Sequence, residues 1–69
     1  MPDVLFAPQG GPTTVTPLNQ RAAEKLSARL ELTVAVGENH IVPDSQYARE
    51  LARQLREEDG LDLLGDEYL

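Results

Sequence analysis

The stretch from Asp44 to Gly60 constrains the fold most, because it carries the signals of an amphipathic helix from start to end. Asp44 or Ser45 can cap the N-terminus. Gly60 suits the left-handed position that follows a helix, and Leu61 can fold back onto the last turn. Apolar side chains recur at helical spacing, at Tyr47, Ala48, Leu51, Ala52 and Leu55. This helix needs other parts of the chain to cover its apolar face.

The first helix of the chain is predicted to begin at Thr16 and Pro17, so the Asp44–Gly60 helix is the second. Threonine is a good N-cap, and proline at the next position loses no hydrogen bond because its missing N–H would be unpaired there. The side chains that recur every four residues are Leu18, Ala22, Leu26 and Leu30. The pattern again indicates one apolar face.

Three segments favour strands. Residues 31–36 alternate apolar and polar side chains and predict a half-buried strand, and Ile41-Val42 is either a short return strand or its continuation. Residues 3–7 and 13–16 predict two short strands that can form a hairpin. The alternative for residues 1–12 is a flexible arm.

Together these elements predict an α+β protein, a small two-layer βαβ(β)α sandwich with two helices packed on one face of a short sheet. The strands flanking the first helix are expected to be parallel, joined by a right-handed crossover. The predicted organisation is an N-terminal strand or arm over 1–12, one domain over 13–64 and an acidic tail over 65–69. A chain of 69 residues without cysteine has a thin core and no disulfide to support it.

The charges are placed unevenly. Residues 1–56 hold six acidic and six basic side chains, whereas residues 57–69 hold six acidic and none basic, so the net charge of −6 lies in the last segment. Three of these acids, Glu57 to Asp59, end the second helix, where the helix dipole prefers cations at about 0.3–1 kcal/mol per charge. Such an asymmetry is typical of an interaction tail or a solubilising end.

We therefore expect a protein partner with a basic surface, and the tail alternates acidic and apolar residues as docking peptides do. The candidate partner-binding residues are Glu57, Glu58, Asp59, Asp62, Asp66, Glu67 and Tyr68. In the alternative interpretation, the leucines of this segment close the core and the last four residues fray.

Arg21, Lys25 and Arg29 form a basic stripe on the first helix and are candidates for phosphate contact. Direct binding of nucleic acid is not expected for a chain that is acidic overall. A nucleic-acid-associated regulator, a DNA mimic built from spaced carboxylates, and a structural homodimer are the alternatives to the protein-binding function.

No catalytic signature occurs, so we predict that the protein is not an enzyme and needs no cofactor or metal. His40 is the only histidine, and no zinc-protease, serine-hydrolase or phosphate-loop motif is present. Neither a signal peptide nor an apolar run long enough to span a membrane is seen, which predicts a cytoplasmic protein without membrane contact.

The helix start TPLNQRA at residues 16–22 and the ending EDGL at residues 58–61 resemble short uncharacterised phage and prophage α/β proteins, over about residues 15–63. The resemblance implies a phage accessory protein that acts by binding, such as an inhibitor or modulator of a host protein. It implies no active-site residues.

Overall fold

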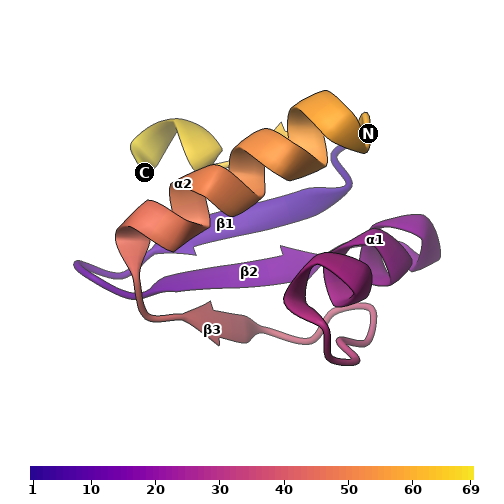
Figure 1. Ribbon diagram of the computed structural model, residues 1–69, viewed down its shortest axis with the longest axis horizontal. Helices are drawn as coiled ribbons and strands as arrows, with labels where there is room; N and C mark the ends of the chain where they lie inside the picture. The colour runs from indigo at the N-terminus through magenta and orange to yellow at the C-terminus, as the bar shows by residue number, and fades with distance from the viewer.

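The computed structural model describes residues 1–69 and has two helices on one face of a four-stranded sheet (Figure 1). The elements in chain order are β1 (Val4–Pro8), β2 (Thr13–Pro17), α1 (Gln20–Leu30), β3 (His40–Val42), α2 (Ser45–Arg53), the π-helical turn η1 (Gln54–Glu58), β4 (Leu63–Leu64) and the 3-10 turn η2 (Asp66–Tyr68). The predicted α+β class and the packing of both helices on one face are confirmed. No helix of the structure has the length and apolarity needed to cross a membrane.

The strand order is β3-β2-β1-β4, so β1 and β2 are the central strands. They form an antiparallel hairpin in which Phe6 lies opposite Val15. β4 pairs with β1 in parallel, and β3 pairs with β2 antiparallel. Residues 4–8, for which a flexible arm was one alternative, thus lie in the middle of the sheet.

The predicted strand over residues 31–36 is wrong. Only Val34 is buried there, and its N–H donates to the Ser27 hydroxyl (2.9 Å) while the same hydroxyl donates to its C=O (3.3 Å). Leu32 and Val36 are 46% and 47% exposed. The segment alternates in sequence, but the Ser27 side chain of α1 satisfies the backbone N–H and C=O of Val34, the one buried residue, so no neighbouring strand is needed there.

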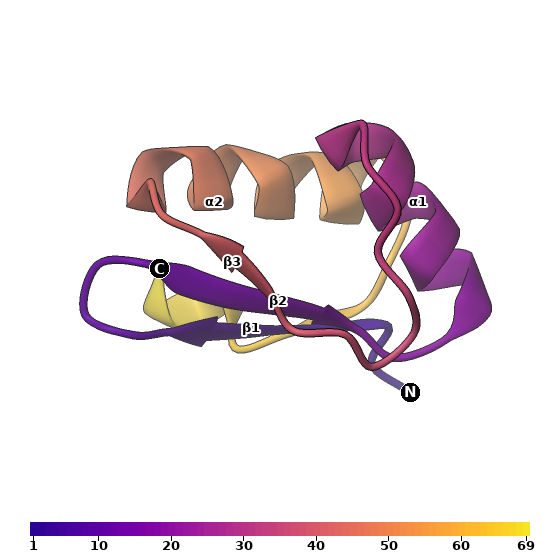
Figure 2. The same ribbon diagram turned by 90° about the horizontal axis from the view of Figure 1, so that it is seen from below.

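The predicted parallel crossover is also wrong, because the strand that follows α1 is β3 and it runs antiparallel to β2. The loop of residues 31–39 returns to the end of β2, where the Gly37 N–H donates to the Pro17 C=O (2.8 Å). β3 therefore starts opposite Val15, in the middle of β2, and runs back along its first half. Figure 2 shows this loop descending from α1 to the level of the sheet.

α1 begins later in the chain than predicted. Asn19 is the N-cap, and its side-chain oxygen accepts the Ala22 N–H at 2.9 Å. Thr16 and Pro17 belong to β2, opposite Leu5 and Val4. The hairpin takes up residues whose local sequence also suits a helix start, because pairing with β1 supplies a full ladder of backbone hydrogen bonds.

α2 follows the prediction closely. Asp44 caps it by accepting the Gln46 N–H (2.9 Å), and the buried stripe consists of Ala48, Leu51, Ala52 and Leu55. Tyr47, expected in that stripe, is 45% exposed. The helix widens into a π-turn before Gly60, which has φ +68°, and the Leu61 N–H then bonds to the Leu55 C=O (2.9 Å).

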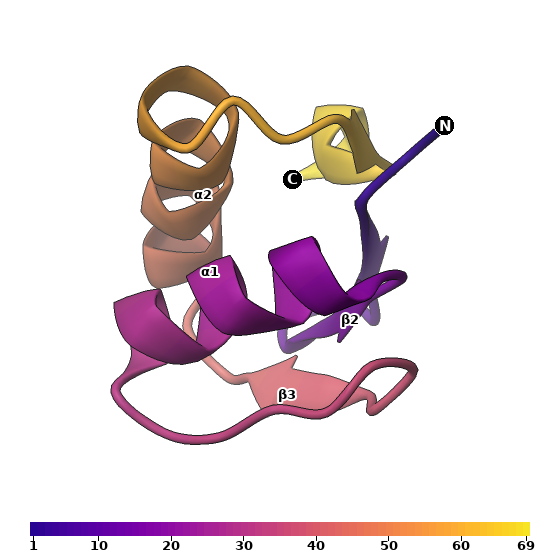
Figure 3. The same ribbon diagram turned by 90° about the vertical axis from the view of Figure 1, so that its right-hand side faces the viewer.

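The core lies between the helices and the facing side of the sheet. It consists of Val4, Phe6, Val15, Ala22, Leu26, Val34, Val42, Ala48, Leu51, Ala52, Leu55 and Leu61. Residues 65–69, expected as a tail, form η2 beside β1 at the edge away from β3, and Leu69 packs against the core (Figure 3).

The Asp3 carboxylate joins three parts of the chain that are distant in sequence. One oxygen accepts the Asn19 side-chain N–H (2.7 Å) and the other accepts the Asp62 backbone N–H (2.8 Å). Asp3 thereby ties β1 to the cap of α1 and to the start of β4. These two hydrogen bonds, with that from Asp62 first, lower the pKa of Asp3.

Stability is expected to fall in acid partly through Asp3. Because its pKa is lower in the folded state, its contribution is complete above the unfolded pKa, about 3.9, and is lost as pH falls through the folded value. Asp3→Asn should therefore lower the urea midpoint at pH 6, and this difference from wild type should shrink towards pH 2–3. Asp62→Asn, at a neighbouring carboxylate that accepts no hydrogen bond, is the control. A difference that stays constant with pH would contradict this account.

Candidate interaction surface

Most acids of the segment 57–69 are neutralised within the molecule. Ion pairs join Arg29 to Asp59 (3.1 Å) and to Glu58 (3.2 Å), and Arg53 to Glu58 (3.2 Å). Arg53 also lies 3.5 Å from Glu57 and 2.7 Å from Glu50, and Arg56 pairs with Asp66. Four of the seven candidate contact residues, Glu57, Glu58, Asp59 and Asp66, thus have basic partners in the same chain.

These ion pairs explain why acids sit at the C-terminal end of a helix. The Arg29 guanidinium donates to both oxygens of Asp59. This bidentate contact is the main reason why the pKa of Arg29 is raised, and the bond to Glu58 adds to the effect. Arg53 lowers the pKa of Glu50 in the same way. Glu58 and Asp59 join the end of the second helix to α1, and Glu57 pairs with Arg53 of its own helix. These ion pairs offset the cost of placing acids at the end of a helix, where the dipole prefers cations.

Two of the three residues of the basic stripe predicted for phosphate contact are bound by residues at the end of the second helix. Arg29 is engaged by Glu58 and Asp59, and an Arg21 nitrogen donates to the Asp59 backbone C=O (3.1 Å). Lys25 is exposed and makes no ion pair. Only one of the three candidates is therefore a cation without a partner in the chain.

Three candidate residues remain available at the C-terminal edge of the molecule. The Asp62 and Glu67 side chains make no hydrogen bond or ion pair and are exposed, and Tyr68 is 76% exposed. They lie on either side of β4, which is an edge strand, and on η2. We call Asp62, Glu67 and Tyr68 the C-terminal edge patch.

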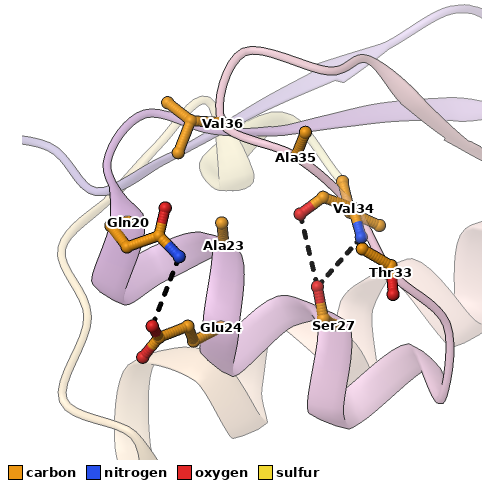
Figure 4. Close-up of a pocket in the computed structure, with 8 residues that line it drawn as sticks. All are labelled: Gln20, Ala23, Glu24, Ser27, Thr33, Val34, Ala35 and Val36. Carbon is orange, nitrogen blue, oxygen red and sulfur yellow. Dashed lines mark hydrogen bonds between the residues drawn. The ribbon is translucent and has the colours of Figure 1, made fainter.

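A second surface feature is an open groove between α1 and residues 33–36 (Figure 4). Its walls are Gln20, Ala23, Glu24, Ser27, Thr33, Val34, Ala35 and Val36. Glu24 is the only ionisable side chain, and it accepts a hydrogen bond from Gln20 (3.2 Å), while the Ser27 hydroxyl is engaged by Val34. The groove holds no base beside its serine and so no activated nucleophile.

His40 is half-buried at the start of β3, and no group of three or more histidine, aspartate or glutamate side chains is placed to hold a metal ion. Every buried side-chain nitrogen and oxygen has a hydrogen-bond partner. The side chains that the sequence did not single out have structural roles: Asp3, Asn19 and Ser27 each join two different segments of the chain by hydrogen bonds. Of these, only Asn19 had a local signal, as a residue type that favours N-caps.

No family model, curated protein or solved structure matches the chain.

Proposed function

We propose that the protein is a small acidic, non-enzymatic binding protein that contacts a protein partner with a basic surface through the C-terminal edge patch. The observation that carries the proposal is that Tyr68 is 76% exposed next to Glu67, and that the Glu67 and Asp62 carboxylates are exposed and have no internal partners. Other acids of the same segment are neutralised by arginines of this chain. An exposed tyrosine can serve as the aromatic anchor of an interface, and unpaired carboxylates can steer a basic partner towards it.

The chemistry of the patch favours a basic partner. Exposed carboxylates attract cationic surfaces over about 8–10 Å at physiological salt, and they accelerate encounter more than they strengthen the final complex. Tyrosine supplies contact area at low entropic cost and is enriched at binding hot spots. If the resemblance to phage proteins reflects descent, the partner is a host protein that this chain inhibits or modulates.

The test uses three immobilised baits. Wild type is compared with Asp62→Asn/Glu67→Gln/Tyr68→Ala and with the matched control Glu24→Gln/Glu31→Gln/Tyr47→Ala, which changes charge and tyrosine content equally at exposed positions elsewhere. Proteins retained from a lysate of the cells that express the gene are identified, and the purified partner is titrated at two salt concentrations.

We expect wild type and the control to bind the same basic protein, more weakly at high salt. The edge-patch variant should lose at least about tenfold in affinity and show a flatter salt dependence. Equal binding by wild type and the edge-patch variant, or a partner whose affinity does not depend on salt, would overturn the proposal.

A further inference from the structure

The groove between α1 and residues 33–36 has one wall with unpaired backbone groups. Residues 31–36 have the alternating, β-branched sequence of a strand, but no strand of the sheet pairs with them. The N–H and C=O groups of Thr33 and Val36, which line the groove, make no hydrogen bond to other residues of the chain. Both residues are exposed. The groove therefore offers another molecule the backbone donors and acceptors that a neighbouring strand would bind.

The groove and its rim carry negative charge only. Glu24 lines the groove, and Glu31 and Glu38 lie in the loop that forms the other wall. All three carboxylates are exposed, and none makes an ion pair. The three basic residues of α1 recur every four positions on another side of the helix, where two of them contact the end of α2. Charge complementarity therefore favours a cationic ligand.

The shape of the groove suits a long side chain with an aliphatic stem. Its volume of about 710 Å³ lies within the range of about 300–1,000 Å³ for ligand clefts. In Figure 4, Ala23 and Glu24 of α1 lie on one wall and Val36 lies on the other. Arginine and lysine place their stems along such apolar surface and keep the charged group at a polar rim. Gln20 donates to one oxygen of Glu24 (3.2 Å), so the other carboxylate oxygen and the Gln20 amide oxygen are free to accept.

We infer that this groove binds an extended peptide segment of another protein, and that the segment carries an arginine. The guanidinium donates to Glu24 and to the Gln20 amide oxygen, because its planar group can make parallel hydrogen bonds to neighbouring oxygens. The aliphatic stem lies against Ala23 and Val36. The peptide backbone bonds to the free groups of Thr33 and Val36, as in the addition of a strand to an exposed edge.

Charge and hydrogen bonding together select a peptide over other ligands. The three carboxylates repel a nucleic acid, whose backbone is negative. A polyamine carries the right charge but brings no acceptor for the free N–H groups of Thr33 and Val36. A peptide with an arginine supplies the positive charge, the donors and the acceptors.

The inference does not rest on the proposed function, because the groove shares no residue with the C-terminal edge patch. Glu24→Gln is part of the control variant for the edge patch and is the test variant for the groove. Each surface is thus tested by substitutions that leave the other intact, and the two proposals can fail separately.

Selection from a library of short random peptides, displayed on yeast, tests the inference with the full chain. The selected peptides should carry an arginine beside β-branched residues. The strongest is synthesised in two forms, one with arginine and one with citrulline, which has a similar shape without the charge. Wild type should bind the arginine form at least about tenfold more tightly. Glu24→Gln should bind both forms equally weakly. Glu57→Gln, which removes a charge at an exposed position of η1, should behave as wild type.

Nuclear magnetic resonance then locates the bound peptide. The amide protons of Thr33 and Val36 should shift downfield and exchange more slowly with solvent, because they gain hydrogen bonds. Val36→Lys, at an exposed position, places a cation in the groove and should abolish binding.

Four results would each overturn the inference. These are a library that yields no binding peptide, selected peptides without a cation, a preference for arginine that persists in Glu24→Gln, and amide signals of Thr33 and Val36 that do not change.

Discussion

Gly65→Ala is expected to unfold most of the protein at room temperature. Gly65 has φ +89° and ψ −8°, a left-handed conformation that costs other residues about 1–3 kcal/mol. A Cβ at this position would also overlap the backbone carbonyl of Phe6 in β1. Moving a central strand adds about 1–3 kcal/mol of overpacking. The sum is comparable with the whole stability of a domain this small, about 3–5 kcal/mol.

Gly37→Ala is the matched control, since Gly37 has a similar φ of +81° but no atom within 4 Å of the position that a Cβ would take. Its cost should be the conformational one alone. Urea unfolding followed by circular dichroism at neutral pH measures both variants. The difference between them, about 1–3 kcal/mol, reports the close approach of η2 to β1. Equal midpoints would mean that the C-terminal segment does not pack against Phe6.

Phe6→Ala should be at least as damaging. Phe6 is 2% exposed, lies opposite Val15 in the central hairpin, and belongs to the core beneath the helices. Removing a buried phenylalanine side chain costs about 3–5 kcal/mol. We therefore expect a largely unfolded chain, measured by urea titration or by a lost thermal transition.

Leu32→Ala gives the contrast. The alternation of residues 31–36 predicted that Leu32 lies on the buried side of a strand, but it is 46% exposed in a loop. Its substitution should change the free energy of unfolding by about 0.5 kcal/mol or less. A large loss at Leu32 with a small one at Phe6 would restore the predicted strand and the flexible N-terminal arm.

The candidate surface shows where reasoning from the sequence stops. Counting charges correctly located the net charge in residues 57–69, but it could not reveal which acids are neutralised. Arg29 and Asp59 are thirty positions apart and meet only because α1 passes the end of α2. Two sets of candidates, the acidic segment and the basic stripe, therefore bind each other, and three of the ten residues form the C-terminal edge patch.

Local chemistry was enough to determine α2. Its cap at Asp44, its apolar stripe and its stop at Gly60 depend on residues within a few positions of one another, and these signals agree. The hairpin of residues 4–17 was also predictable, because two short β-branched or apolar runs flank a Pro-Gly turn.

Tertiary structure decided the rest. Thr16-Pro17 suits either a helix start or a strand, and pairing with β1 chose the strand. Residues 31–36 alternate like a strand, but Ser27 of α1 takes the hydrogen bonds of Val34 that a neighbouring strand would need. The parallel pairing of β4 with β1 joins residues about sixty positions apart. No local pattern encodes such a contact, because its free energy comes from surfaces that exist only once the chain has folded.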